Sequence, residues 1–147
     1  MPDCPFCKIV AGEAEALIVG DFLHALAFIP LAPAAWGHTL VIPKRHVTDL
    51  FGLGDRADEV FYAVRYMDSA LRKALSPDGM NLIQSTGTAA GQTVPHLHFH
   101  LMPRWEGDPL GDLWEKGREW WQRGIEAHPD GFAATKRQQM ADAIRRP

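Results

Sequence analysis

The sequence predicts an α+β domain with a mainly antiparallel sheet, one long helix and further helices towards the C-terminus. Two observations carry this prediction. Short apolar runs lie before and after a single long helical segment, and they do not alternate strictly with helices as in a doubly wound fold. The chain has 147 residues, 46% of them hydrophobic and 22% charged, which is enough for one domain to bury a core without cross-links.

The first part of the chain favours strands. Short apolar runs cover residues 16–19 and 25–29, on either side of Gly20 and Asp21, which are residue types that favour a turn. A third run covers residues 38–43. We therefore expect three strands before the long helix.

The long helix is predicted over residues 58–75 by apolar residues that recur at steps of four, three and four positions. These residues share one face of a helix; they are Val60, Val64, Met67 and Leu71. Pro77 and Gly79 follow the last turn and are typical of a helix end. The segment is thus an amphipathic helix with strands on both sides of it in the sequence.

Two more strands are predicted after this helix. Residues 81–85 indicate a strand, residues 87–91 a glycine-containing turn, and residues 93–102 the last strand. In the last strand histidine alternates with apolar residues, and alternate side chains of a strand point to opposite faces. The apolar members are expected in the core; they are Leu97, Phe99 and Leu101. The histidines are expected about 7 Å apart on the other face; they are His96, His98 and His100.

The C-terminal part is rich in tryptophan. Residues 105–122 contain four of the five tryptophans, and we interpret much of this segment as an aromatic helix that docks on the sheet or on a second subunit. Residues 135–147 predict a second short helix, which we interpret as a solvated surface element.

Composition argues against several classes of partner. Lys and Arg total 15 against 18 Asp and Glu, so the net charge is −3 and no nucleic acid partner is expected. The longest uncharged apolar stretch, residues 25–36, is interrupted by Pro30 and Pro33 and is shorter than the roughly 20 residues of a membrane helix. The first residues are not typical of a secretory signal, so we expect a cytoplasmic protein without a membrane partner.

The three alternating histidines allow three interpretations. They are polar outer positions of a half-exposed strand, ligands of one metal ion, or a nucleophilic centre. A shared metal ion is disfavoured, because His96 and His100 would lie about 13 Å apart along a straight strand. An imidazole nitrogen can attack phosphorus at neutral pH when its other nitrogen is held in one tautomer, and neighbouring imidazoles can donate to the phosphoryl oxygens.

Two motifs carry a resemblance to a known family. The run His-Leu-His-Phe-His-Leu-Met at residues 96–102 follows Gly-Gln-Thr-Val at residues 91–94, and Gly-His-Thr-Leu-Val-Ile-Pro-Lys-Arg-His covers residues 37–46. In this order the motifs resemble those of the histidine-triad (HIT) family of nucleotide hydrolases and transferases. The resemblance implies a HIT-like fold in a domain of residues 3–108 and leaves residues 109–147 as a C-terminal helical extension.

The resemblance also implies roles for individual residues. His98 would be the nucleophile that forms a covalent nucleotidyl-histidine on the α-phosphate of a nucleotide, and His100 and His38 would flank that phosphate. Gln92 and Thr93 occupy positions that contact the phosphate or the leaving group. Apolar residues that would line the nucleoside pocket, or simply pack in the core, are Phe6, Ile9 and Phe28.

Two positions depart from the family pattern. Pro30 stands eight residues before His38, where members commonly carry Asp or Asn for the ribose hydroxyls, and its side chain has no donor or acceptor. Ser85 replaces an Asn and keeps a hydrogen-bonding oxygen with a shorter reach. The pattern of the phosphate site is thus complete, whereas that of the ribose site is not.

Cys4 and Cys7 form a Cys-x-x-Cys pair with three interpretations. A redox pair normally follows a strand, which is absent before Cys4, and a pair of buried thiols is possible. We favour half of a structural zinc site, because the spacing lets both thiolates reach one tetrahedral ion. The resemblance implies that His46 and His96 complete the site, as in zinc-bearing members of the family.

The sequence analysis therefore predicts a HIT-type enzyme, a homodimer as the family usually is. Its substrate would be a dinucleoside polyphosphate or a nucleoside phosphoramidate. Some of its motifs resemble the branch of the family that cleaves the first kind of substrate, and others resemble the branch that cleaves the second. The alternative is a zinc-stabilised nucleotide-binding module or interaction scaffold without turnover. The two remaining histidines, His24 and His128, are interpreted as surface residues.

Overall fold

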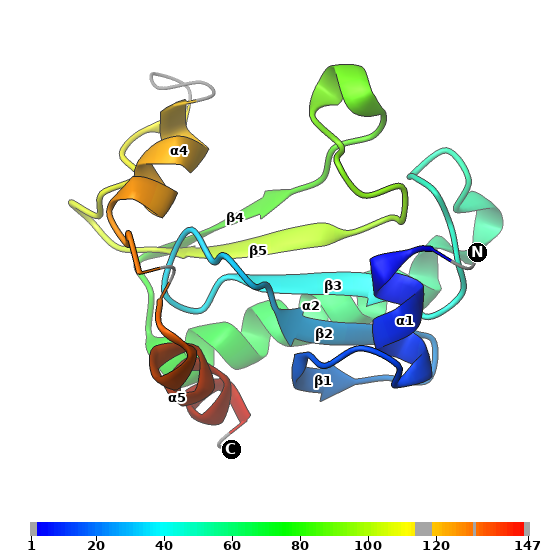
Figure 1. Cartoon of the computed structure of the whole chain (residues 1–147), viewed down its shortest axis with the longest axis horizontal. Helices are drawn as coiled ribbons and strands as arrows, with labels where there is room; N and C mark the ends of the chain where they lie inside the picture. The colour runs from blue at the N-terminus through cyan, green and yellow to red at the C-terminus, as the bar shows by residue number, and fades with distance from the viewer. Residues whose placement is uncertain (1–2, 114–118, 131, 146–147) are drawn as a thin grey trace.

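The fold is a five-stranded antiparallel sheet with helices on both faces (Figure 1). The computed structural model describes residues 3–113, 119–130 and 132–145. The strand order is β1-β2-β3-β5-β4, and every neighbouring pair is antiparallel. The strands are β1 Leu17–Asp21, β2 Ala25–Ile29, β3 Thr39–Pro43, β4 Gly79–Ile83 and β5 Phe99–Arg104. The predicted fold class and the order of strands along the chain are confirmed. The turn expected at Gly20 and Asp21 is wrong, because both residues lie within β1 and pair with β2 after a register shift.

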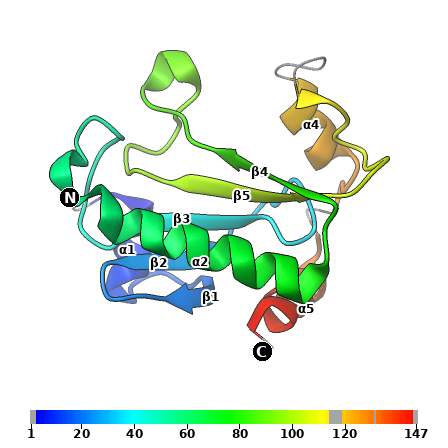
Figure 2. The same ribbon diagram turned by 180° about the vertical axis from the view of Figure 1, so that it is seen from behind.

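The long helix α2, Ala57–Leu75, covers one face of the sheet (Figure 2). A short 3₁₀ turn, Gly54–Arg56, leads into it. The predicted apolar face is confirmed, because its four members are buried together with Ala63. The helix ends at Ser76, which adopts a left-handed conformation with φ 49° and donates its N–H to the Arg72 carbonyl.

The opposite face carries a short helix that the sequence analysis did not predict, α1, Pro5–Ala11 (Figure 1). Its signals are local: Cys4 is the N-cap, Pro5 stands in the first turn, and Gly12 closes the helix with φ 75°. Alternate side chains of a strand point to opposite faces of the sheet, so each strand contributes to two apolar clusters. In β2, Ala25, Ala27 and Ile29 belong to the core under α2, whereas Leu26 and Phe28 pack with Phe6 of α1.

The predicted strand over residues 93–102 is wrong at its start, because β5 begins at Phe99. Pro95 has no N–H for a ladder, and the His96 N–H instead turns back to the Val94 carbonyl. The Leu97 N–H then bonds the Val47 carbonyl, outside any strand. The predicted core positions hold nonetheless: Leu97, Phe99 and Leu101 are all buried under α2.

The C-terminal part differs from its prediction in two ways. Residues 105–112 form no helix, and the described helix of the tryptophan-rich segment is α4, Glu119–Glu126, while residues 114–118 lie outside the described residues. The second helix is α5, Ala134–Arg145, and its interpretation as a solvated element is wrong. Its buried residues join the core beside α2 and β1; they are Met140, Ala141 and Ile144. Among the described residues, no helix is long and apolar enough to cross a membrane.

Candidate active site and metal site

Three histidines meet where β3 and β5 pair. His38 immediately precedes β3, His100 lies on β5, and His98 immediately precedes β5. The His100 ring centroid lies 5.2 Å from that of His38 and 5.0 Å from that of His98. The β3–β5 register, which aligns Leu40 with His100, brings the first of these pairs together across 62 positions of sequence. The predicted phosphate residues are thus one cluster, called the triad below: His38, His98 and His100. It differs from the sequence motif of residues 96–100 in that His38 takes the place of His96.

Hydrogen bonding fixes the tautomer of His98. Its Nδ1 lies 2.7 Å from the His96 carbonyl oxygen, and because a carbonyl can only accept, Nδ1 carries the proton. The Nε2 atom then holds the lone pair. His98 is 8% exposed, and its ring meets Phe6 edge-on at 5.4 Å. The arrangement presents one unprotonated imidazole nitrogen from a nearly buried ring, which is the state of a nucleophile.

A second chain of hydrogen bonds orders His38 and His100. The Ala34 N–H donates to His38 Nδ1 at 3.0 Å, so the proton of His38 is on Nε2. That N–H faces His100 Nδ1 at 3.0 Å, which therefore accepts. The proton of His100 is consequently on Nε2. The chain from Ala34 to His100 thus ends in an N–H donor beside His98, which suits an anionic oxygen.

Burial keeps this pair uncharged. Burial lowers the pKa of His38 well below its usual value, and the neighbouring His100 lowers it further. Burial likewise lowers the pKa of His100 to about 3, with a further contribution from His98. Both rings are therefore neutral at pH 7, which is the protonation state that the relay of hydrogen bonds requires.

The predicted phosphate-contact residues lie on the loop before β5. The Gln92 side chain is buried; its Nε2 donates to the Thr48 and Val94 carbonyls at 2.6 and 3.0 Å, and its Oε1 accepts the Gly87 N–H at 2.8 Å. Gln92 therefore ties the loop together. Thr93 is exposed and Ser85 is half-buried just after β4. Their contact with a substrate stays a prediction.

The predicted nucleoside residues share one apolar cluster on the α1 face of the sheet. Phe6 meets Phe28 edge-on at 5.5 Å, and Ile9 packs against the same cluster. Because Phe6 also contacts His98, the cluster is continuous with the three histidines. Pro30 follows β2 directly and is half-buried. The cluster therefore places apolar side chains beside His98.

The four predicted metal ligands converge. The ligand atoms of Cys4, Cys7, His46 and His96 all lie within 4.8 Å of one another, so this cluster is able to hold a metal ion. Cys4 Sγ lies 3.3 Å from His96 Nδ1, and Cys7 Sγ lies 3.3 Å from His46 Nδ1. A tetrahedral zinc ion with bonds of ~2.0–2.3 Å separates its ligand atoms by roughly 3.3–3.8 Å, so the residues fit the ion.

A backbone contact orients one of these ligands. His96 Nε2 lies 2.9 Å from the Pro43 carbonyl oxygen and therefore carries the proton, which leaves the lone pair of Nδ1 facing the two thiols. His96 is completely buried.

The two histidines outside both clusters differ from each other. His24 is exposed as predicted, whereas His128 is half-buried with its ring 3.9 Å from that of Phe132.

One aromatic residue of this site, Trp121, was not predicted from the sequence. Trp121 of α4 meets the rings of His38 and His100 edge-on, with centroid distances of 5.2 and 4.9 Å. The sequence shows that the segment is rich in tryptophan. Which of these indoles contacts the histidines depends on long-range contacts, which periodicity does not encode.

A histidine triad beside a cysteine–histidine cluster on this antiparallel sheet defines a protein of the histidine-triad class. The family model of the HIT domain matches residues 11–107, and the chain belongs to the HIT family. Protein hit of Bacillus subtilis is 39% identical over 115 residues, covering 77% of this chain and 79% of the relative. The adenosine 5′-monophosphoramidase of Schizosaccharomyces pombe is 37% identical over 101 residues, covering 69% and 74%.

Solved structures agree with this assignment. A Hit-like protein of Bartonella henselae involved in cell-cycle regulation superposes with a TM-score of 0.77 at 29% identity, covering 99% of this chain and 96% of that one. A zinc-bound histidine triad family protein of Mycobacterium smegmatis has a TM-score of 0.69 at 35% identity, covering 87% and 97%. The HIT-like fold is thus shared.

Proposed function

We propose that this protein is a nucleotide phosphohydrolase or nucleotidyl transferase that acts at the α-phosphate through a covalent intermediate on His98. The observation that carries the proposal is the 2.7 Å hydrogen bond from His98 Nδ1–H to the His96 carbonyl, which leaves Nε2 as a nucleophile. The relationship to an adenosine 5′-monophosphoramidase makes a nucleoside phosphoramidate the first substrate to test and a dinucleoside polyphosphate the second.

The proposed reaction has two displacements. His98 Nε2 attacks the α-phosphorus, a bond from nitrogen to phosphorus forms, and the leaving group departs with its bonding electrons. The His100 Nε2–H donates to a phosphoryl oxygen as charge develops there. A water molecule then attacks the same phosphorus and gives up one proton to solvent, the electron pair of the nitrogen–phosphorus bond returns to His98 Nε2, and a nucleoside monophosphate leaves. The leaving group of the first step takes up one proton from solvent, so the two steps balance. The nucleoside lies against the apolar cluster of Phe6, Ile9 and Phe28, and Gln92, Thr93 and Ser85 surround the phosphate.

The test is detection of the intermediate. The protein is mixed with adenosine phosphoramidate or a diadenosine polyphosphate, and nucleoside monophosphate is measured together with the mass of the protein. We expect product and a transient nucleotidyl adduct, neither of which forms with His98→Ala. His24→Ala is the matched control, because it removes an exposed imidazole that belongs neither to the three clustered histidines nor to the cysteine–histidine cluster. Product without an adduct on His98 would refute the covalent route.

We further propose that the Cys4–Cys7–His46–His96 cluster holds a structural zinc ion. Four protein ligands close a tetrahedral site, so the ion would stabilise the fold and leave catalysis to the histidines. Its ligands tie α1 to the segments before β5 and after β3. Metal analysis of the purified protein and of a Cys4→Ala, Cys7→Ala double variant tests this, and equal zinc content in both would refute it.

The homodimer is part of the same proposal. Within the described part of the chain β4 is an edge strand that pairs with β5 alone, and Leu82 within it is 50% exposed. An unpaired edge with an exposed apolar side chain favours association with a second chain. Sedimentation of the wild type against Leu82→Lys measures the mass of the particle, and a wild type that sediments as a monomer contradicts the dimer.

A binding module without turnover is the second candidate. Pro30 favours it, because the proline ring offers no hydrogen bond to a ribose hydroxyl at the position where the family commonly has one. In the experiment above this candidate predicts nucleotide binding with neither monophosphate nor adduct from either substrate. The intact chain of hydrogen bonds through His38 and His100 favours the enzyme.

A further inference from the structure

The C-terminal helix α4 touches the proposed catalytic residues directly. The rings of Trp121, His38 and His100 form a triangle with centroid distances of 5.2, 5.2 and 4.9 Å. At the other side of His98 stands Phe6 of α1, at 5.4 Å. The row of imidazoles therefore lies between an aromatic residue of the first helix and one of the C-terminal extension.

A second contact docks α4 against the backbone that holds His38. Gly124 is buried one turn after Trp121, and a Cβ atom at this glycine would lie 2.6 Å from the Ala34 carbonyl oxygen and 3.1 Å from the Ala34 Cβ. The Ala34 N–H is the donor that fixes His38 in its tautomer. The same helix thus packs on both ends of the Ala34–His38 contact.

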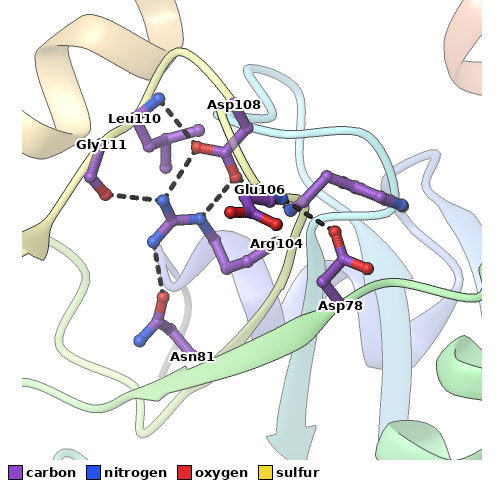
Figure 3. Close-up of polar contacts among 8 residues, drawn as sticks. Asp78, Asn81, Arg104, Glu106, Asp108, Leu110 and Gly111 are labelled. Atoms are coloured by element: carbon purple, nitrogen blue, oxygen red, sulfur yellow. Dashed lines mark hydrogen bonds and ion pairs between the residues drawn. The ribbon is translucent and has the colours of Figure 1, made fainter.

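The loop that follows β5 is fixed by a polar network (Figure 3). The Arg104 guanidinium makes two hydrogen bonds to the Asp108 carboxylate, at 2.7 and 2.8 Å, and also bonds Asn81 Oδ1 and the Gly111 carbonyl. Burial acts to raise the pKa of Asp108, but hydrogen bonds from Arg104 and the Trp105 N–H outweigh it, so this pKa lies below its usual value. The start of the extension is therefore held to β4 and β5.

We propose that α4 is part of the active site, and that Trp121 is a positioning residue which covers His38 and His100 and holds them as one relay of neutral donors. This inference rests on the proposed function, in which His38 and His100 lie beside the phosphate of the substrate. It gives the C-terminal extension a role in catalysis in addition to its packing.

The physical basis is exclusion of water from an uncharged pair. Protonation of His100 at Nδ1 would place a proton against the His38 Nε2–H, and the opposite tautomer of His38 would do the same against the Ala34 N–H. A buried neutral pair avoids this conflict, and the lowered pKa values of both residues reflect that burial. Trp121 supplies the apolar contact on the α4 side.

No other charge compensates on the described part of the chain. Residues 30–37 contain no charged side chain, and the residues aligned with His100 in the sheet are Leu40 and Ile83. The titratable neighbour on the third side is His98. The described charged residues of α4 are all exposed; they are Glu119, Arg123 and Glu126. Loss of the indole would therefore admit water without uncovering a counter-charge among these described residues.

The first test measures the protonation of His38 and His100 and does not depend on an activity assay. Imidazole ¹H–¹⁵N NMR spectra of the full chain report the tautomers and titration of His38 and His100, in the wild type, Trp121→Ala and Trp121→Phe. We expect both rings of Trp121→Ala to titrate at least about one pH unit higher, because they lose part of their burial. Trp121→Phe, which keeps a ring in place, should stay near the wild type. Unchanged titration in Trp121→Ala would overturn the proposal.

The second test uses the nucleotidylation rate of His98 against pH. The acid limb of the profile should move up in pH in Trp121→Ala, and the rate at pH 7 should fall by about tenfold because the donors are misplaced. Gln122→Ala, on the exposed side of α4, is the matched control and should match the wild type. A control that shifts as much as Trp121→Ala would make the effect one of general helix stability and would refute the positioning role.

A further variant covers the case in which Trp121→Ala does not fold, as judged by circular dichroism. Gly124→Ala must displace α4 from Ala34 and should move the same NMR signals in the same direction, whereas unchanged signals refute the role of the helix. Failure of the proposed function gives a different result: the wild type forms no adduct, while the NMR comparison still decides what Trp121 does.

Discussion

His96 and His98 are two residues apart and both are nearly or completely buried, and yet they belong to two different clusters of side chains. Each gives one ring proton to a backbone carbonyl, but from opposite nitrogens. His96 donates from Nε2 to Pro43 and turns Nδ1 to the cysteines, whereas His98 donates from Nδ1 to His96 and keeps Nε2 for the triad. The backbone acceptor, rather than the residue type, decides which nitrogen is available.

The two centres also differ in what surrounds them. The metal cluster pairs its histidines with two thiols, which become anionic ligands when an ion binds. The triad has only imidazoles, a backbone N–H and aromatic rings as partners, so its rings are neutral donors and acceptors. One centre is suited to bind a cation permanently and the other to receive an anion during a reaction.

Removal of His98 should give the largest effect and should leave the metal cluster intact. We expect His98→Ala to lose at least about 10³-fold in nucleotide cleavage, because the nucleophile itself is deleted. Bound metal and thermal midpoint should stay close to those of the wild type. Cleavage assays and metal analysis on one preparation measure both, and a parallel loss of metal would show that the two histidines form a single centre.

Removal of His96 should give the complementary result. His96→Ala deletes a ligand and empties a buried site, so we expect loss of bound metal and destabilisation by roughly 2–5 kcal/mol. Urea unfolding with and without a chelator measures this. The chelator should destabilise the wild type and leave the variant unchanged. Equal sensitivity of both proteins to the chelator would contradict the assignment of His96.

Much of this arrangement was predictable because it depends on local pattern. The step of four, three and four residues located α2, and the alternation of residues 96–101 separated core from histidines although β5 starts only at Phe99. The segment before Phe99 bends at residues 94–96 but keeps the alternation of buried apolar residues and histidines, and periodicity alone does not distinguish that from a strand. Cys4, Pro5 and Gly12 are typical of a helix start and end, so α1 was also predictable from the sequence.

The rest depends on contacts between distant residues. The Pro43 and His96 carbonyls, the Ala34 N–H and the Trp121 indole set the tautomers and burial of the two groups of histidines, and no local pattern encodes which of these groups meets which ring. Likewise α5 is buried by the partners it finds on α2 and β1, while its own composition is polar. Tertiary context overrides the local signal in both cases.

Removal of His38 tests the relay within the triad, with a smaller effect than removal of His98. His38→Phe keeps a planar ring beside Trp121 but deletes the donor to His100 and the acceptor of the Ala34 N–H. We expect nucleotide cleavage to fall by about 10²-fold, within the usual range for loss of one proton-bearing group, while an adduct on His98 still forms slowly. A rate equal to that of the wild type would remove His38 from the catalytic centre.

The pH dependence of stability separates the triad from the metal cluster. The pKa of His100 is about 3, below its usual value, so between that pH and about 6.5 the unfolded chain binds a proton that the folded chain does not. This residue therefore contributes stability that is present above pH 6.5 and is lost as the pH falls towards 3. Metal ligands also protonate in acid, which adds a second loss.

The comparison of wild type with His100→Gln cancels that metal contribution, because both proteins keep the Cys4–Cys7–His46–His96 cluster. We expect urea midpoints measured from pH 7 to pH 4 to fall less steeply in His100→Gln. His24→Gln, which alters an exposed ring, should follow the wild type. Parallel curves for the wild type and His100→Gln would mean that His100 is not buried in its neutral form, and the distinction between a neutral triad and an ion-binding cluster would fail at that residue.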